Sequence, residues 1–215
     1  NVLLGAPGAD VNTTNTGAFY MFSQPANGFH SASSASIQIY GGVGDGVGAV
    51  AASMGDLNQD GIEDWLFGNP ENASVSSSAG TAYLISGPLQ SGSLSSLNTW
   101  NVTGSAYDRL GASLARGDLN ADGTEDVIVG APTPGTQTAH IYAFSGSTLS
   151  GTTSVSSAYL TLTASSGGTD LGTSLVVGDL DGDGYDDLAA GAPDQLVGAS
   201  VSGVVTLYEG PFTGS

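Results

Sequence analysis

The sequence predicts an all-β protein built from repeated four-stranded sheets. Short runs of apolar, β-branched and aromatic residues alternate with clusters of Gly, Ser, Asn and Asp, which is typical of strands joined by turns. The segment GDLNADGTEDVIVGAP (117–132) has close copies that begin 62 residues before it and 61 residues after it. A fixed period of this size determines the architecture and is therefore interpreted before any single motif.

Each period contains four strand-like segments, which are clearest in the second repeat. The first segment is rich in small residues, the second is apolar throughout, and the third and fourth alternate between apolar and polar residues. These segments are 110–116, 126–130, 139–144 and 158–163. Four antiparallel strands in a repeat of this length fit a β-propeller blade, in which the second strand is covered on both faces by neighbouring blades. A parallel β-helix or a β-sandwich is the alternative, although a β-helix has a shorter rung and a sandwich need not repeat itself.

The repeats divide the chain into about three and a half blades of one partial propeller. The N-terminal segment lacks a first strand, and the C-terminal segment stops before a fourth strand. The expected units are a partial blade at 1–42, full blades at 43–105 and 106–166, and a partial blade at 167–215.

The composition excludes several classes of function. Lys and Arg number two and Asp and Glu twenty among 215 residues, so the formal net charge is −18. This charge argues against a nucleic-acid partner and against anionic membrane surfaces. No apolar run approaches the ~18 residues of a transmembrane helix, so we expect no membrane insertion. The chain has no Cys, which excludes disulfides and thiolate metal sites.

The loop between the first and second strands reads D-x-[DN]-x-D-G-x-x-D in each of the three copies. Side-chain oxygens at positions 1, 3, 5 and 9, with the backbone carbonyl at position 7, can surround a hard cation, and Ca²⁺ accepts about six to eight oxygen ligands. The Gly at position 6 permits the bend around the ion. The sequence therefore predicts three calcium sites. Their candidate ligands are Asp56, Asn58, Asp60, the Ile62 carbonyl and Asp64; Asp118, Asn120, Asp122, the Thr124 carbonyl and Asp126; and Asp179, Asp181, Asp183, the Tyr185 carbonyl and Asp187.

Other interpretations of these loops fit less well. An EF-hand requires a Glu at position 12 and flanking helices, but position 12 is Phe67, Val129 or Ala190 inside a strand. Mg²⁺ prefers to keep several waters. Acidic turns without a metal are the remaining alternative. The third loop carries four carboxylates where the others carry three, so we expect it to bind Ca²⁺ most tightly.

The repeats resemble a known family. LGASLARGDLNADGTEDVIVGAP (110–132) and LGTSLVVGDLDGDGYDDLAAGAP (171–193) are similar to FG-GAP repeats, the blades of integrin α-subunit β-propellers. The Gly-Ala-Pro element recurs at 5–7, and the sequence at 68–70 departs from it by one residue. The resemblance implies calcium sites on one face of a propeller, often seven-bladed, and a role in adhesion or ligand binding.

We therefore expect a non-enzymatic, calcium-binding module of an extracellular or cell-surface protein that serves protein interaction, adhesion or self-assembly. An open half-ring exposes blade faces and strand edges, so we expect the partner to be another protein or a second copy that completes the ring as a homodimer. The competing interpretation is that the chain is a fragment of a longer propeller protein. The alternatives are an accessory propeller of a secreted hydrolase and a carbohydrate-binding propeller with Trp65 or Trp100 at the sugar. Residues 116–118 form Arg-Gly-Asp, a cell-attachment tripeptide, but Asp118 is also the first residue of the second loop motif.

Overall fold

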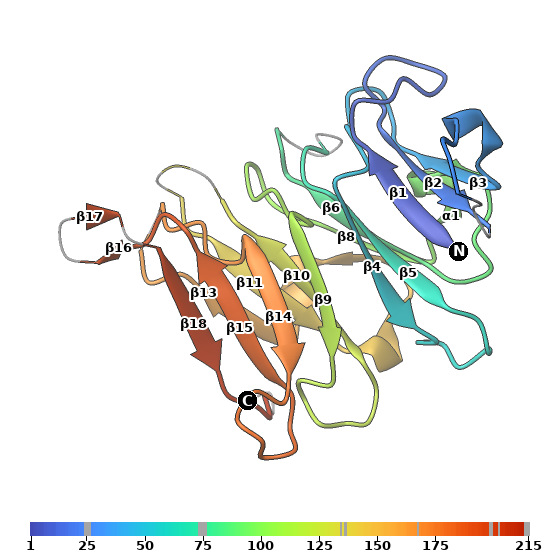
Figure 1. Ribbon diagram of the computed structural model, residues 1–215. Helices are drawn as coiled ribbons and strands as arrows, with labels where there is room; N and C mark the ends of the chain where they lie inside the picture. Colours follow the sequence, from blue (N-terminus) through green and yellow to red (C-terminus); the bar gives the residue numbers. More distant parts are fainter. Residues whose placement is uncertain are drawn as a thin grey trace.

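The computed structural model describes residues 1–23, 27–72, 77–133, 135, 137–166, 168–197, 200–201 and 203–212. Its strands form four blade-like sheets that stand side by side (Figure 1), together with one small two-stranded hairpin. This arrangement confirms the predicted all-β fold of a partial propeller. Within the described residues, no helix has the length and apolar character needed to cross a bilayer.

The two middle sheets each contain the four antiparallel strands expected of a blade. In the first they are β4 (Val50–Gly55), β5 (Asp64–Asn69), β6 (Thr81–Ile85) and β8 (Trp100–Thr103). In the second they are β9 (Ser113–Gly117), β10 (Asp126–Ala131), β11 (His140–Phe144) and β13 (Leu160–Thr163). The prediction that a strand begins at residue 110 is wrong, because a turn precedes β9. In that turn the Ala112 N–H donates to the Arg109 carbonyl at 3.1 Å, and Gly111 has a φ of +91°.

The two outer sheets each contain three of the four blade strands among their described residues. The N-terminal sheet has β1 (Val2–Ala6), β2 (Ala18–Phe22) and β3 (Ile37–Tyr40), and its β1 corresponds to the second strand of a blade. The C-terminal sheet has β14 (Ser174–Gly178), β15 (Asp187–Ala192) and β18 (Val204–Tyr208), the first three strands of a blade.

Several short elements have no signal in the sequence pattern. The strands β7 (Gly92–Ser93) and β12 (Gly151–Ser154) pair in parallel with the outer strands β3 and β8 of the preceding sheet, so they join neighbouring blades. The other short elements are the hairpin β16 (Leu196–Val197) and β17 (Ser200–Val201), α1 (Leu94–Leu97), and 3-10 helices at Ala32–Ser34, Gly146–Thr148 and Val155–Ser157.

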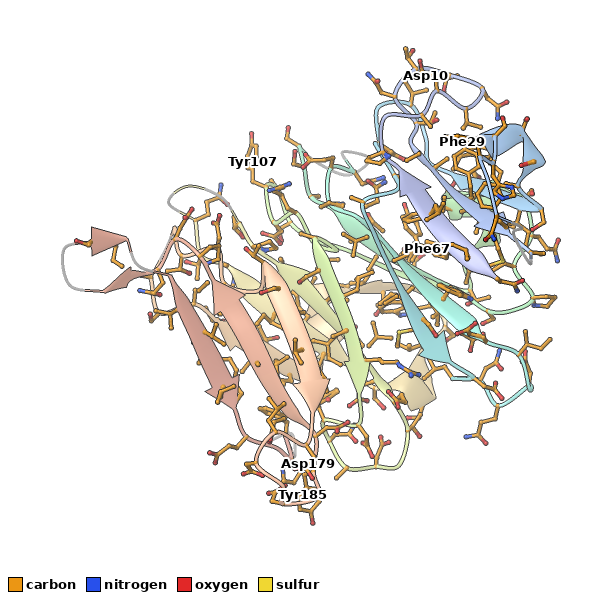
Figure 2. All side chains as sticks on the ribbon, viewed as in Figure 1. Asp10, Phe29, Phe67, Tyr107, Asp179 and Tyr185 are labelled. Carbon is orange, nitrogen blue, oxygen red and sulfur yellow. The ribbon has the colours of Figure 1, made fainter. Side chains whose placement is uncertain are left out.

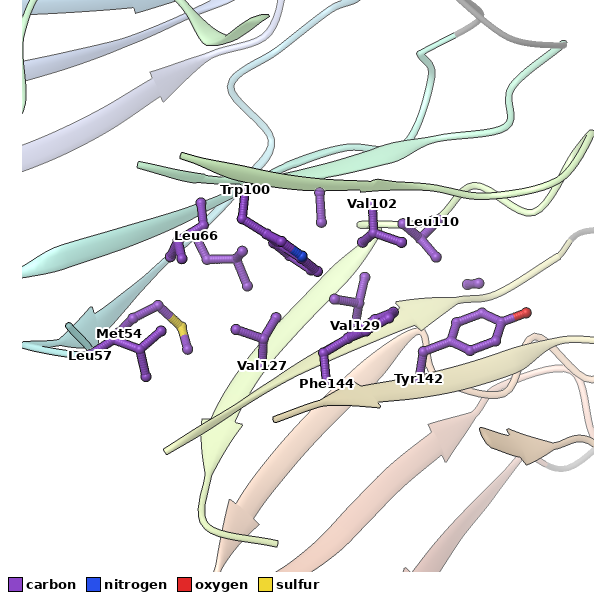
Figure 3. Packing of buried hydrophobic residues seen from close by; sticks show 13 residues of the cluster. Met54, Leu57, Leu66, Trp100, Val102, Leu110, Val127, Val129, Tyr142 and Phe144 are labelled. Carbon is purple, nitrogen blue, oxygen red and sulfur yellow. The ribbon is translucent and has the colours of Figure 1, made fainter. Parts of the chain in front are cut away.

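The core consists of apolar layers between neighbouring sheets. Figure 3 shows the middle layer, where Val127 and Val129 of β10 lie in one buried cluster with Trp100 of β8. Ile128, which points to the opposite face of β10, belongs to the next layer. All three β10 residues are fully buried, which confirms that the second strand is covered on both faces. Trp100 meets Phe144 edge-on with ring centroids 5.3 Å apart, so aromatic contact adds to the burial of the layer.

Candidate metal centre

The three acidic loops lie along one edge of the sheets. They connect β4 to β5, β9 to β10 and β14 to β15 (Figure 1). Figure 2 labels Asp179 and Tyr185 on the third loop, and Tyr107 on the opposite edge. Because a buried second strand follows each loop, the ninth residue of the motif is anchored at the edge of the core. These ninth residues are buried: Asp64, Asp126 and Asp187.

The three loops share one backbone course. Positions 4 and 6 of the motif have a positive φ in every loop. The angles are +60° and +87° at Gln59 and Gly61, +58° and +86° at Ala121 and Gly123, and +86° and +94° at Gly182 and Gly184. A glycine adopts this conformation without strain, whereas Gln59 and Ala121 carry a Cβ that disfavours it.

The first aspartate of each motif accepts hydrogen bonds from the backbone of its own loop. Asp56 Oδ1 accepts from the Asp60 N–H at 2.9 Å, and Asp56 Oδ2 accepts from the Gly61 N–H at 2.8 Å. Asp118 makes the matching bonds at 2.9 and 2.8 Å. Asp179 Oδ2 accepts from the Gly184 N–H at 3.1 Å as in the other loops, but its Oδ1 accepts from the Gly182 N–H, one position earlier, at 2.7 Å. The loop therefore wraps around this carboxylate.

Positions 3 and 5 continue the same pattern. Asn58 Oδ1 accepts from the Asp60 N–H at 2.9 Å, and Asp60 Oδ1 accepts from the Ile62 N–H at 2.9 Å. The second and third loops repeat both bonds at 2.8 to 3.0 Å. Each oxygen has a second lone pair, so these bonds do not remove its capacity to bind a cation. The side chains of Ile62 and Tyr185 at position 7 are exposed, and the structure does not test the role predicted for their carbonyls.

The ninth aspartate ties the loop to the hairpin that follows the third strand. Asp64 Oδ2 accepts from the Leu57 N–H at 3.0 Å, and its Oδ1 accepts from the Gly87 N–H at 2.9 Å. Asp187 accepts in the same way from the N–H groups of Leu180 and Gly210, both at 2.9 Å. These backbone donors lower the pKa of Asp187.

In the second loop the ninth aspartate has side-chain partners in addition to the backbone donors Gly146 and Asn120. The Tyr159 hydroxyl donates to Asp126 Oδ2 at 2.6 Å, and the Asn120 side-chain amide donates to Asp126 Oδ1 at 3.4 Å. Burial raises the pKa of Asp126 to about 6, and the Tyr159 hydrogen bond opposes that rise. Burial and the neighbouring Asp126 carboxylate both raise the pKa of Tyr159.

The sequence analysis missed two further contributions to these loops: a glycine that packs against each loop, and a carboxylate that links two loops. Gly87, Gly146 and Gly210 each lie just after the third strand, beside a loop, and a Cβ at any of them would crowd the carbonyl of the motif's eighth residue. The eighth residue of the third loop, Asp186, also accepts from the Asp118 N–H at 2.8 Å and so links two neighbouring loops. A glycine two residues after the third strand of each sheet that carries an acidic loop is the signal that points to the first group.

The third loop brings three carboxylates together. One oxygen from each of Asp179, Asp181 and Asp187 lies within 4.8 Å of the other two, whereas Asp183 is not part of this group. The corresponding positions in the other two loops carry Asp, Asn and Asp. Carboxylates this close repel one another unless a cation lies between them. An all-oxygen donor set suits Ca²⁺ rather than a thiophilic metal, so these residues fit the ion that the resemblance implies.

The Arg-Gly-Asp tripeptide ends β9 and enters the second loop. Its aspartate, Asp118, has both carboxylate oxygens engaged by backbone N–H groups of its own loop. Arg116 extends toward Glu125 with 4.0 Å between Nε and Oε2. The tripeptide is thus part of the loop architecture, and its carboxylate lies within the loop that wraps around it.

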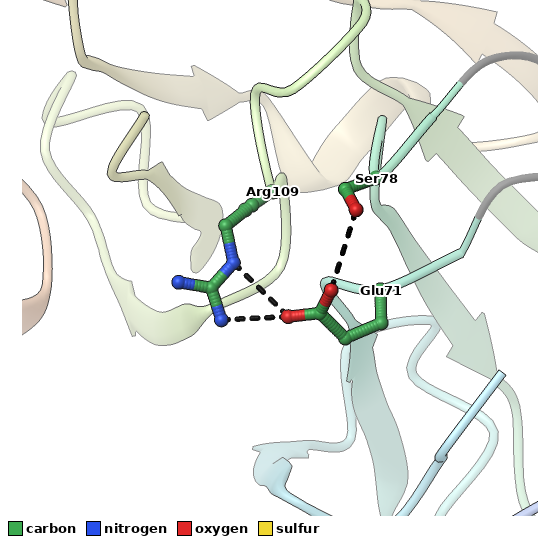
Figure 4. Close-up of polar contacts among 3 residues, drawn as sticks. All are labelled: Glu71, Ser78 and Arg109. Atoms are coloured by element: carbon green, nitrogen blue, oxygen red, sulfur yellow. Dashed lines mark hydrogen bonds and ion pairs between the residues drawn. The ribbon is translucent and has the colours of Figure 1, made fainter. Parts of the chain in front are cut away.

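At the opposite edge the described residues include an ion pair and several hydrogen bonds, and no group of three close carboxylates is found among them. Arg109 donates to Glu71 Oε1 through Nε at 3.1 Å and Nη2 at 2.7 Å, while Ser78 donates to Oε2 at 3.3 Å (Figure 4). The buried Asp108 accepts from the Ser105 N–H at 2.7 Å and closes a tight turn. These acidic residues therefore stabilise turns.

Comparison with known proteins identifies the repeats. The FG-GAP repeat family matches residues 110–144 and 171–208. Phosphatidylinositol-glycan-specific phospholipase D of Homo sapiens is 32% identical over 177 residues, covering 75% of this chain and 20% of that protein. Integrin alpha-4 of Xenopus laevis is 33% identical over 147 residues, covering 66% of this chain and 14% of that protein. Integrin alpha-V of Gallus gallus is 30% identical over 180 residues, covering 76% of this chain and 15% of that protein.

The chain spans about a fifth or less of the length of these curated relatives. The matched segments contain the second and third acidic loops together with the strands on both sides of them. The protein therefore carries FG-GAP repeats, and its sheets are blades of a partial β-propeller.

Proposed function

We propose that this chain is a calcium-binding, non-catalytic propeller module of an extracellular or cell-surface protein, in which it serves protein interaction or adhesion. The observation that carries the proposal is the convergence of Asp179, Asp181 and Asp187 in a loop whose backbone course is repeated in two other loops. Each of the three loops would hold one Ca²⁺ through the side chains at positions 1, 3, 5 and 9 and the carbonyl at position 7.

The chain's own residues prepare each site for an ion. Backbone N–H groups fix the orientation of the loop carboxylates, and the ninth aspartate is anchored between the loop and the adjacent hairpin. A bound dication would offset the repulsion among these carboxylates and part of the net charge of −18. The expected result is a rigid edge that holds strand, loop and hairpin together.

The interaction role is supported by similarity to the integrin α subunits, which aligns over 66% to 76% of this chain. Calcium at the millimolar concentrations found outside cells keeps even modest sites occupied, which agrees with an extracellular location.

A second candidate is an accessory domain of a secreted hydrolase. It is favoured by the similarity to a phospholipase D, an enzyme in which the matched segment is 20% of the length. A sugar-binding role has less support, because Trp100 is buried and Trp65 packs against an apolar core cluster.

Calcium titration of the purified chain tests the proposal. We expect calorimetry to give three Ca²⁺ per chain. We also expect EDTA to lower Tm by roughly 5–10 °C for each site that it empties, and so by roughly 15–30 °C for three filled sites, since occupancy at a hundred times Kd contributes about 2.7 kcal/mol per site and this size of domain shifts about 2–4 °C per kcal/mol.

The control variant is Asp194→Asn, which neutralises an exposed carboxylate outside the motifs and should keep all three sites. The absence of both heat on titration and a Tm change with EDTA would overturn the metal assignment. Hydrolytic activity of the chain itself would contradict the non-catalytic role.

A further inference from the structure

Neighbouring sheets in this chain pack through one repeated interface. The second and third strands of each sheet present an apolar face to the next sheet. Leu84 of β6 lies in the same buried cluster as Val129 of β10, and Ala143 of β11 lies in the same cluster as Ala190 of β15. The sheets therefore stack with a constant polarity, in which each sheet has one face toward its predecessor and another toward its successor.

The glycine near the end of each second strand marks this contact. A Cβ added at Gly5, Gly68 or Gly130 would overlap a glycine carbonyl in the next sheet; these carbonyls belong to Gly48, Gly111 and Gly172. The fourth glycine of the series, Gly191, has only Ser174 of its own sheet within reach. In the preceding sheet the equivalent of Ser174 is Ser113, whose hydroxyl donates to the Gly172 carbonyl across the interface.

On the side of the C-terminal sheet where a following sheet would pack, no other blade-like sheet lies among the described residues. Leu180, Val205 and Leu207 are 47%, 69% and 64% exposed. Their equivalents in the preceding sheet are buried: Leu119, Ile141 and Ala143. Val176 of β14, which pairs with Ala189 next to Leu207, is also exposed. This exposed group is called the tail face.

The N-terminal sheet exposes the complementary side. Val2 and Leu4 of β1 are 41% and 54% exposed. Their equivalents, Val127 and Val129, are fully buried against the preceding sheet. This second group is called the head face, and Figure 1 shows that β1 and β18 lie at opposite ends of the row of sheets.

We propose that the tail face of one chain binds the head face of a second copy of this chain. The two faces correspond, in the second and third strands, to the two halves of the contact that already joins each pair of neighbouring sheets within the chain. The head sheet has no first strand among its described residues, so it offers no counterpart of the Gly48, Gly111 and Gly172 carbonyls. None of the exposed residues named on either face is charged, although the chain carries a net charge of −18. Electrostatic repulsion between two copies therefore comes from charges elsewhere on their surfaces. We expect the burial of apolar surface at the contact to outweigh this repulsion.

The proposed contact is heterologous, because a tail face meets a head face rather than another tail face. Such a contact either closes into a ring or continues as an open array. The inference rests on the apolar faces and holds whether or not the acidic loops bind calcium.

Sedimentation equilibrium of the chain and two face variants tests this inference. We expect the unmodified chain to reach at least twice its 21.2 kDa mass at high concentration. Leu4→Glu in the head face and Val205→Glu in the tail face should each give a species of monomer mass. Val43→Glu, which changes an exposed apolar residue in the loop between β3 and β4, is the matched control and should still associate.

Mixing the two face variants is the decisive measurement. The Leu4→Glu chain keeps its tail face and the Val205→Glu chain keeps its head face, so the mixture should form a one-to-one complex of twice the monomer mass. Circular dichroism and Tm verify that both variants fold. Each experiment is run with Ca²⁺ and with EDTA, so a failure of metal binding is distinguished from a failure of association. A monomeric unmodified chain, association of either variant alone, or a mixture that stays monomeric would overturn the proposal.

Discussion

The second and third acidic loops share a motif and a backbone course but hold their ninth residue differently. Asp126 accepts a hydrogen bond from the Tyr159 hydroxyl in addition to backbone N–H groups of Gly146 and Asn120, whereas the donors to Asp187 are backbone N–H groups. Burial raises the pKa of Asp126 to about 6, while backbone donors lower the pKa of Asp187. The carboxylate at position 9 is therefore costly to ionise in the second loop, whereas the third loop favours its ionised form. Identical motifs do not imply identical sites.

Two other motif positions also differ between the second and third loops, and both differences favour a charged, ion-binding third loop. Position 3 is Asn120 in the second loop and Asp181 in the third, so the third loop has one more carboxylate. Position 4, where φ is positive in both, is Ala121 in the second loop and Gly182 in the third. More charge and less backbone strain favour the third loop, which supports the prediction that it binds Ca²⁺ most tightly.

The largest expected difference is in Tm, between the Asp187→Asn and Asp126→Asn variants, with both measured in EDTA. At neutral pH the folded state favours ionised Asp187, since its pKa is lowered on folding, and it disfavours ionised Asp126, since that pKa is raised. An amide at 187 also places a donor against one of two backbone N–H groups, whereas the Tyr159 hydroxyl can rotate to accept from an amide at 126. We expect Asp187→Asn to lower Tm by several degrees and Asp126→Asn to lower it less.

Thermal unfolding followed by circular dichroism makes this measurement. Asp194→Asn serves again as the control for the loss of one negative charge. A larger Tm loss for Asp126→Asn than for Asp187→Asn would show that the hydrogen-bond partners do not determine how each loop tolerates neutralisation.

Exchanging position 3 should move the affinity of the two loops in opposite directions. Asp181→Asn gives the third loop the donor types of the second and should weaken its Ca²⁺ binding roughly tenfold, because charge count tunes affinity in such sites. Asn120→Asp should strengthen the second loop by a similar factor. Calorimetric titration resolves the change, and in EDTA Asp181→Asn should not lower Tm, because Asp181 is exposed and its neutralisation relieves repulsion among the clustered carboxylates. Unchanged Ca²⁺ affinities in both variants would mean that position 3 is not a ligand.

The motif and the strands could be predicted because their determinants are local. The candidate ligand positions follow from offsets within nine residues, and the apolar run that follows Asp126 in β10 predicts burial on both faces. Tyr159 could not be found in this way, because it reaches Asp126 only after β13 pairs with β11. The strands β7 and β12 were missed for a related reason, since their Gly, Ser and Thr residues become strands through pairing with the preceding sheet.

The smallest expected effect tests the backbone strain at position 4. A residue with a Cβ at positive φ costs about 1–2 kcal/mol, and glycine returns part of that gain through its freedom in the unfolded chain. Ala121→Gly should therefore raise stability by about 0.5 kcal/mol, or about 1–2 °C in Tm, while Gly182→Ala should lower it by about 1 kcal/mol. No neighbouring atom lies within 4 Å of a Cβ built at Gly182, so the loss reports backbone conformation and not a clash. Equal and opposite shifts would mean that the two loops differ in strain alone, whereas a fall in stability for Ala121→Gly would show that the second loop needs its Cβ for another contact.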